Sequence, residues 1–297
     1  MLEWSREIGV GDHNLGNSVL ELEDGFLIAG SINQNSSLIK LDKVNGSTIF
    51  IQTHDHGGID AYEQAVKIPG GLVAVGYINS EDPWNTFFVW GEGHLVFIDD
   101  NGNIQSSQSL NEYMAQGYRV KYSDGSIIIS GLSEDASDFI LIKMDLEGNL
   151  IWNQSYGGNS DDHCFGMDVN DNGEIFLAGH TLSGTENWDT YTLKVNTDGD
   201  LLWERVVGNP RGFDPDYIHD EAWGVKATND GGCVTIAGTG DEYDEYSECY
   251  EEECSDIWRA YLIKFDELGQ VDWEITFSPL EISDDNYDWA GEDIDLT

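Results

Sequence analysis

A repeat of roughly 50 residues runs through the chain and constrains its fold more than any other feature. The fullest copies have a glycine turn, an apolar run ending in Ala-Gly, an apolar run containing Lys, a second glycine turn and a Trp. One copy reads Asp171-Asn172-Gly173, Leu177-Ala178-Gly179, Leu193-Lys194-Val195, Asp198-Gly199 and Trp203. The next reads Asp230-Gly231-Gly232, Ile236-Ala237-Gly238, Leu262-Ile263-Lys264, Leu268-Gly269 and Trp273.

Each copy predicts four short strands, which we call a, b, c and d. The glycine turns suit tight a–b and c–d hairpins, because glycine accepts the positive φ that such turns require. Strand b is an uninterrupted apolar run, as in Ile127-Ile128-Ile129, which is typical of a strand buried on both faces. Four-stranded units that bury both faces must pack against one another, and radial repetition of such units is a propeller.

The sequence therefore predicts an all-β fold, a β-propeller of four-stranded antiparallel blades with five complete blades and a partial sixth. We expect a single β-propeller domain over residues 1–297. Its repeat units are predicted at about 12–55, 56–108, 109–156, 157–207 and 208–277, with a partial unit at 278–297. An additional d-like strand is predicted at Leu2–Arg6 and an a-like strand at Asp288–Ile294, which leaves open how the ring closes.

One copy resembles a known repeat. The order of Tyr156-Gly157-Gly158, Asp161-Asp162, Asp171-Asn172-Gly173 and Ala178-Gly179-His180-Thr181 is similar to the SBBP-type β-propeller repeat of secreted and cell-surface proteins in bacteria and archaea. The resemblance implies a propeller and an extracellular or cell-surface location. It implies no catalytic residues, because that repeat class has no shared catalytic motif, and propellers support many functions.

The charge excludes several partners. Only 13 Lys and Arg face 57 Asp and Glu, so the net charge is −44. Such a surface repels nucleic acids and anionic membranes. No run of 18 apolar residues occurs, and the first residues do not resemble a signal peptide, so we expect no membrane insertion. The acidity suits solubility, adaptation to high salt, or binding of a cation such as Ca²⁺.

The b–c and d–a loops are predicted to share one face of the propeller, and function usually lies on such loops. All seven His lie in or beside these loops, as do six of the ten Trp. Aromatic side chains beside acids suit contact with a protein or carbohydrate ligand. The predicted ligand-binding residues are Trp84, Trp90, Trp188, Trp223, Trp258, His163 and His219. The other four Trp occupy strand d, where we expect packing between blades: Trp4, Trp152, Trp203 and Trp273.

Acidic residues recur where the d–a loops meet strand a. Asp60, Asp162 and Asp220 would be the acid and base if the protein were an enzyme. Asp161, Asp220, Asp241 and Asp244 are the candidate Ca²⁺ ligands. The alternative is that the recurring Asp orders its own loop by accepting hydrogen bonds from backbone amides. The recurring Lys of strand c are expected to pair with acids: Lys40, Lys143, Lys194 and Lys264.

Two further motifs involve metal and sulfur chemistry. In His54-Asp55-His56 the two imidazoles are two residues apart, so with His13 or His163 nearby they could hold a transition metal. Cys249 and Cys254 lie five residues apart in an acidic, tyrosine-rich loop and could close a disulfide, which favours an oxidising compartment. Cys164 and Cys233 lie within predicted strands and fit buried thiols.

Three functions remain open from the sequence. The first is a non-catalytic binding or structural module that contacts a protein or carbohydrate through the loop-rich face. The second is a glycan-active hydrolase or lyase that uses the recurring carboxylates. The third is a self-assembling surface or filament subunit joined through its terminal strands.

Overall fold

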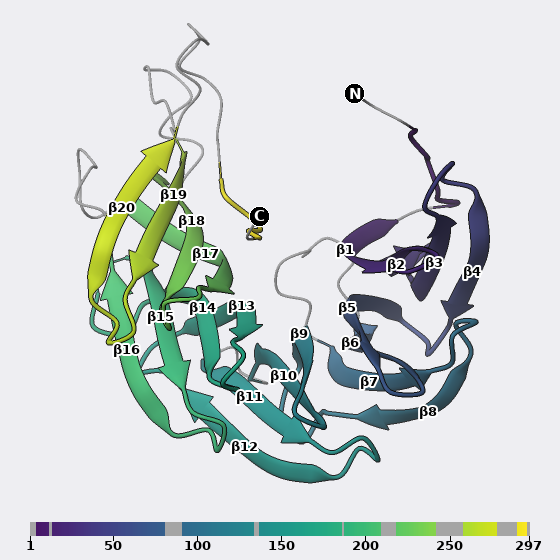
Figure 1. The fold of residues 1–297 in the computed structure, drawn as a ribbon, viewed down its shortest axis with the longest axis horizontal. Helices are drawn as coiled ribbons and strands as arrows, with labels where there is room; N and C mark the ends of the chain where they lie inside the picture. Colours follow the sequence, from purple (N-terminus) through teal and green to yellow (C-terminus); the bar gives the residue numbers. More distant parts are fainter. Residues whose placement is uncertain are drawn as a thin grey trace, which may run out of the picture. The chain divides into compact units, whose positions relative to one another are not determined.

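The computed structural model describes residues 4–11, 14–80, 91–133, 137–185, 187–208, 218–241, 258–277 and 290–295, with only the backbone of Ile218 and Asp241. The described residues form five four-stranded antiparallel sheets, here called blades 1 to 5, and contain no helix (Figure 1). In every blade the strands lie side by side in chain order. The predicted propeller blades are therefore confirmed.

The strands follow the repeat units closely. Blade 1 holds β1 (Leu15–Leu22), β2 (Gly25–Ile32), β3 (Asn35–Asp42) and β4 (Thr48–His54). Blade 2 holds β5 (Ile59–Ile68), β6 (Gly71–Ser80), β7 (Glu92–Ile98) and β8 (Ile104–Ser109). Blade 3 holds β9 (Gln116–Ser123), β10 (Ser126–Leu132), β11 (Phe139–Met144) and β12 (Leu150–Tyr156). Blade 4 holds β13 (Asp162–Val169), β14 (Ile175–Thr181), β15 (Asp189–Val195) and β16 (Leu201–Val207). Blade 5 holds β17 (Ile218–Ala227), β18 (Cys233–Asp241), β19 (Arg259–Phe265) and β20 (Val271–Phe277).

The chain divides into two compact units. Unit 1 comprises Met1–Asp135 and Ile140–Asn153, and therefore blades 1 and 2 and most of blade 3. Unit 2 comprises Ala136–Phe139 and Gln154–Thr297, and therefore blades 4 and 5. The expectation of one domain over the whole chain stays a prediction.

Tight turns form where the glycines predict them. Gly46 and Gly199 of two c–d turns have φ of 65° and 84°, which a residue with a Cβ adopts only with strain. One b–c connection is short. In blade 1 the b–c connection is the two-residue turn Asn33-Gln34, with φ of 50° and 69°. Two successive positive φ values make a tight hairpin that matches the strand twist.

Successive blades bury apolar strands between them within each unit. All seven residues of β10 and nine of the ten residues of β6 are buried, as their uninterrupted apolar runs predict. Strands β1, β2 and β3 of blade 1 contact β5, the first strand of blade 2. In unit 2, β13, β14 and β15 contact β17 in the same way. The a strand of the following blade is thus the surface on which each preceding blade packs.

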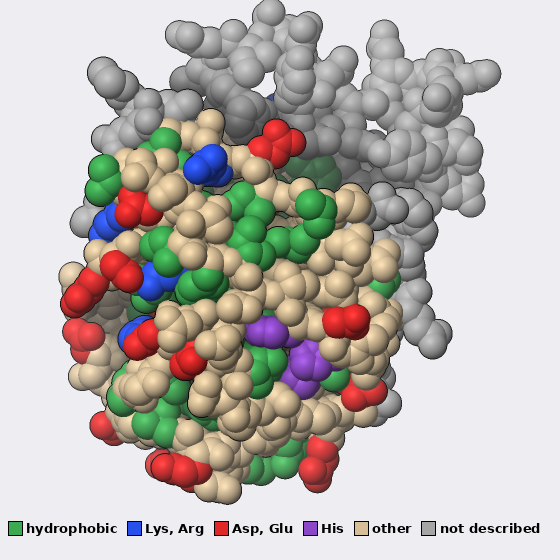
Figure 2. Space-filling view, turned by 90° about the vertical axis from the view of Figure 1, so that its right-hand side faces the viewer, with side chains coloured by type: hydrophobic (Ala, Val, Ile, Leu, Met, Phe, Trp, Pro, Cys, Tyr) green, Lys and Arg blue, Asp and Glu red, His purple; other side chains and the backbone are tan. Residues whose placement is uncertain are grey.

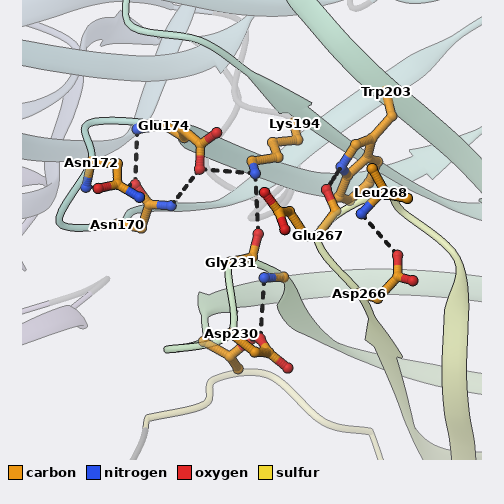
Figure 3. Close-up of polar contacts among 12 residues, drawn as sticks. Asn170, Asn172, Glu174, Lys194, Trp203, Asp230, Gly231, Asp266, Glu267 and Leu268 are labelled. Atoms are coloured by element: carbon orange, nitrogen blue, oxygen red, sulfur yellow. Dashed lines mark hydrogen bonds and ion pairs between the residues drawn. The ribbon is translucent and has the colours of Figure 1, made fainter.

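A recurring joint links the outer strand of one blade to the c–d turn of the next. In unit 2, the indole N–H of Trp203 donates to the Glu267 carbonyl at 3.1 Å, and the Trp203 ring lies against Gly269 (Figure 3). Arg205, two residues further, donates to the Leu268 carbonyl at 3.0 Å. In unit 1, Phe50 lies against Gly102, and Gln52 donates to the Asn101 carbonyl at 3.4 Å.

The N-terminal segment makes the same joint. Trp4 lies against Gly46 in the c–d turn of blade 1, and Arg6 donates from Nε to the Gly46 carbonyl at 2.8 Å. Trp4 and Arg6 therefore act toward blade 1 as Trp203 and Arg205 act toward blade 5. The expectation of blade packing is wrong for Trp273, which is 45% exposed, because the described residues contain no c–d turn of a following blade.

The C-terminal segment packs on blade 5 without forming a strand. The Gly291 N–H donates to the Ala237 carbonyl at 3.2 Å, and Lys226 forms an ion pair with Asp295 at 2.9 Å. Asp288 and Trp289 of the predicted a-like strand lie outside the described residues. The described remainder, residues 290–295, contains no strand, so the partial sixth blade stays a prediction.

Three of the four recurring lysines, Lys40, Lys194 and Lys264, pair with acids as expected. Lys194 is 2% exposed, and its Nζ lies 2.8 Å from Glu174 Oε2 and donates to the Gly231 carbonyl at 3.1 Å (Figure 3). Lys40 pairs with Asp24 at 2.8 Å and Lys264 with Asp230 at 2.9 Å. Burial alone would raise the pKa of Glu174, but hydrogen bonds from Lys194 and Asn170 outweigh it and lower that pKa. These ion pairs belong to the blade structure rather than to a reactive site.

Candidate functional site

An aromatic–histidine cluster in unit 2 brings together several predicted ligand-binding residues. It consists of His163, Phe165, His180, Trp188 and Trp223. His163 and Phe165 lie on β13, Phe165 at a bulge between Cys164 and Gly166, and both rings contact His180. His180 lies on the neighbouring strand β14, Trp188 directly precedes β15, and Trp223 lies on β17 of blade 5.

The rings of the cluster are in direct contact. The His163 ring lies 4.5 Å from the Trp188 ring between centroids, and the His180 ring meets Trp188 edge-on at 4.8 Å. Phe165 joins the two blades, because its ring lies 5.2 Å from His180 and 4.7 Å from Trp223. His163 and His180 are 6% and 2% exposed, whereas both indoles are partly exposed. Two accessible indoles thus rest on buried imidazoles.

Both imidazoles are neutral at pH 7. Burial lowers the pKa of His163 to about 4, although the nearby charge of Asp161 acts in the opposite direction. Burial and the neighbouring His163 hold the pKa of His180 well below its usual value. His163 Nδ1 and His180 Nε2 are 3.3 Å apart, which is a hydrogen bond between two neutral rings. A general base works best with a pKa near the operating pH, so these imidazoles suit a structural role.

His219 lies beside this cluster on β17, with Nδ1 3.8 Å from Glu221 Oε1. Trp258, immediately before β19, packs against Gly238 and near Ala290. Trp188, Trp223, His163 and His219 therefore lie on neighbouring strands of one unit. Trp84 and Trp90 lie outside the described residues.

The three candidate catalytic acids are buried, and the carboxylates of Asp60 and Asp162 are bound to backbone amides. Asp60 is fully buried, and its two carboxylate oxygens accept from the His56 N–H at 2.7 Å and the Asn79 N–H at 2.9 Å. Burial raises the pKa of Asp60 despite these bonds. Asp162 occupies the same position in blade 4. Its Oδ2 accepts from the Gly158 N–H at 2.6 Å and the Ser183 hydroxyl at 3.1 Å.

The backbone of the recurring Asp is also held. The Asp60 N–H donates to the Gln34 carbonyl at 2.8 Å, and the Asp220 N–H donates to the Trp188 carbonyl at 2.7 Å. Asp220 is 1% exposed. The carboxylates of Asp60 and Asp162 therefore order their d–a loops, which favours the loop-ordering interpretation over catalysis for these two residues. The main-chain bonds of Asp60 and Asp220 tie strand a to the preceding b–c connection.

The other metal and sulfur candidates are placed as follows. Asp161 is exposed, and its carbonyl accepts from the Leu182 N–H at 2.9 Å. The side chain of Asp241 and the residues Asp244, Cys249 and Cys254 lie outside the described part of the chain. Cys164 and Cys233 are buried thiols. Where side chains are described, no group of three or more His, Cys, Asp or Glu could hold a metal ion. The Ca²⁺ site and the disulfide stay predictions.

Sequence reasoning missed two residues of chemical interest. Phe165 lies at the bulge of β13, which no pattern in the sequence marks. Glu63 on β5 had no motif either. Burial raises its pKa to about 7, although the charge of Arg119 and a hydrogen bond from Gln116 act in the opposite direction. A carboxyl group with that pKa can exchange a proton near neutral pH.

Comparison with known proteins identifies the fold. No protein-family model matches the chain, and no curated protein matches its sequence. Hydrazine synthase from Kuenenia stuttgartiensis matches with a TM-score of 0.58 and 13% identity, over 87% of this chain and 64% of that one. Quinohemoprotein alcohol dehydrogenase from Comamonas testosteroni matches with a TM-score of 0.51 and 10% identity, over 89% of this chain and 53% of that one.

The chain thus spans between about half and two thirds of the length of these two proteins. At such low identity the likeness concerns the fold alone. In the described residues no helix is both long and apolar enough to cross a membrane. Together with five blades of four antiparallel strands, the comparison establishes that the chain has a β-propeller fold.

Proposed function

We propose that this protein is a non-catalytic binding module whose contact surface includes Trp188 and Trp223. The observation that carries the proposal is the pair of partly exposed indoles packed on buried, neutral His163 and His180. Rings fixed from below lose little conformational freedom when a ligand covers them, and Trp is enriched among residues that dominate binding energy.

The proposed ligand is an uncharged glycan, with a protein surface as the second class. The apolar face of a sugar ring can stack on an indole, and carboxylates at the edge can accept hydrogen bonds from sugar hydroxyls. Glu221 and the exposed Asp161 supply such carboxylates beside the cluster. The net charge of −44 disfavours anionic glycans and acidic proteins.

The finer classification rests on the repeat motif. The likeness to the SBBP-type repeat supports an extracellular or cell-surface location, and the acidic loops support Ca²⁺ as a bound ion. Equilibrium dialysis with Ca²⁺ tests the ion, and labelling of intact cells tests the location.

The binding proposal is tested by substitution on a glycan array followed by titration. We expect Trp188→Ala and Trp223→Ala each to weaken binding of the captured glycan by roughly tenfold or more, which corresponds to at least ~1.4 kcal/mol. Trp273→Ala is the matched control, because Trp273 is 45% exposed in the same unit but lies on the outer strand β20. Equal losses in all three variants would contradict the assignment.

Two alternatives remain as predictions. A hydrolase or lyase using Asp60, Asp162 and Asp220 would show polysaccharide turnover that is lost on their substitution. A self-assembling subunit would form polymers in sedimentation at rising protein concentration. The backbone hydrogen bonds that hold Asp60 and Asp162 favour the binding module over the enzyme.

A further inference from the structure

Two histidines of unit 1 face each other at a place that the proposed binding surface does not use. The His56 and His94 rings lie 4.6 Å apart between centroids, with 47° between their planes. His56 lies in the loop between β4 and β5, and His94 lies on β7. Figure 2 shows histidine side chains gathered beside hydrophobic ones on one face of the molecule.

The backbone fixes both rings. The His56 N–H donates to Asp60 Oδ2 at 2.7 Å, so the buried Asp60 anchors this loop. His94 pairs with Gly76 of β6 on one side and with Ser109 of β8 on the other. The two imidazoles are therefore presented by a clamped loop and a central strand, as a preorganised site requires.

Three ring nitrogens at this place are buried without a hydrogen-bond partner among the described residues. They are Nδ1 and Nε2 of His94, a residue that is only 5% exposed, and Nε2 of His56. A buried polar atom with no partner costs about 1–3 kcal/mol. Three such atoms on two facing rings indicate that this place receives a group that binds imidazole nitrogen.

The chemistry of the imidazole rings indicates which kind of ion would bind here. A neutral imidazole carries one nitrogen lone pair that it can donate to a metal ion. Neutral imidazole is a ligand for zinc, copper and nickel ions, whereas Ca²⁺ and Mg²⁺ prefer oxygen. The net charge of −44 also concentrates cations near the surface.

We propose that His56 and His94 form a two-histidine site for a divalent first-row transition metal ion, of which Zn²⁺ is the probe. The His54-Asp55-His56 motif predicted a metal ligand here, with His13 or His163 as its partner. The structure instead pairs His56 with His94. His54 has a different contact, because its Nδ1 lies 2.7 Å from the Tyr62 hydroxyl.

The experiment is a calorimetric titration of the chelator-treated full chain with Zn²⁺ in a large excess of Ca²⁺. The Ca²⁺ occupies carboxylates that would otherwise bind zinc nonspecifically. We expect one equivalent of Zn²⁺ to bind. His56→Gln and His94→Gln should each weaken that binding by about tenfold or more, because each removes one of two ligands.

His54→Gln is the matched control, since it removes a neighbouring imidazole but neither facing ring, and it should leave zinc affinity within about threefold of wild type. Circular dichroism of each variant confirms that it is folded. With Cu²⁺ as a second probe, paramagnetic resonance should show coupling to nitrogen that is lost in the double variant. Zinc affinity unchanged in the folded double variant, or lost equally in His54→Gln, would overturn the site.

Discussion

Asp162 orders the loop before it and thereby positions the ring that follows. Its carboxylate holds the Gly158 N–H at 2.6 Å and the Ser183 hydroxyl at 3.1 Å, and the next residue is His163 of the aromatic–histidine cluster. Asp60 holds the equivalent loop in blade 2. A side chain that recurs in several repeats thus supports residues that differ between repeats.

The buried imidazoles should make unit 2 sensitive to acid. The folded pKa of His163, about 4, lies below the ordinary value of 6.5, so between these values the unfolded chain binds more protons. The stability contributed by neutral His163 is therefore complete above pH 6.5 and is lost as the pH falls toward 4. We expect His163→Gln to reduce the pH dependence of unfolding free energy by up to ~1.4 kcal/mol per pH unit in this range.

Urea unfolding of wild type and variant across this pH range measures that difference directly. Carboxylates titrate in both proteins, so their effect cancels in the comparison. Identical slopes for the two proteins would show that His163 is not protonated on unfolding.

At the residue scale, the roles of residues that recur in the repeat were predicted better than the contacts between residues far apart in the sequence. The pairing of Lys194 with an acid was predicted because the lysine recurs in an otherwise apolar strand. The contact between His56 and His94 was not predicted, because the two residues lie almost 40 positions apart in the sequence. Only the folding of the loop against strand β7 brings their rings together. The raised pKa of Glu63 could not be predicted from the sequence either, since it depends on burial and on Arg119 from another blade.

At the element scale, each a strand carries a bulge, which in blades 1 to 4 lies opposite a glycine of strand b and in blade 5 lies opposite Ala237. The register shifts between Gly16 and Ser18 in blade 1 and between Cys164 and Gly166 in blade 4. A Cβ on Gly30 would overlap the Leu15 carbonyl oxygen, and one on Gly179 would overlap the His163 carbonyl oxygen. The Ala-Gly motif of strand b was recognised as a repeat, but the bulge that requires its glycine has no pattern of its own in strand a.

Blade 1 offers a matched pair of substitutions that tests this account. Gly30→Ala should destabilise unit 1 by about 1–3 kcal/mol, because the added methyl forces the backbone of strand a to move. Gly16→Ala, in the partner strand, should change stability by less than about 0.5 kcal/mol, since its nearest contact would be the Ile28 methyl at 3.7 Å. Denaturant unfolding of both variants decides the matter, and equal losses would exclude a specific overlap at Gly30.

For the whole molecule, the dominant property is the excess of acid. With 57 Asp and Glu against 13 Lys and Arg, the folded chain repels itself, and salt screens that repulsion. The buried lysines do not relieve it generally, because Lys40, Lys194 and Lys264 each neutralise an acid in the blade structure.

Raising the concentration of sodium chloride should therefore raise the midpoint of thermal unfolding by several degrees, with potassium chloride acting equally. Differential scanning calorimetry measures this shift. An unchanged or falling midpoint would show that self-repulsion does not limit stability. A rise with Ca²⁺ at far lower concentration than with sodium chloride would support specific cation binding.

The joint between blades has a consequence for how such a chain can change in length. Trp203 with Arg205, and Trp4 with Arg6, meet the glycine turn of a blade in the same manner, so the contact does not depend on which part of the chain supplies it. Copying or excising one complete repeat leaves an outer-strand aromatic residue next to a c–d glycine turn at the new junction, so the same contact can form there. Blade number can then vary by duplication or loss of a gene segment, while the b–c and d–a loops diverge independently.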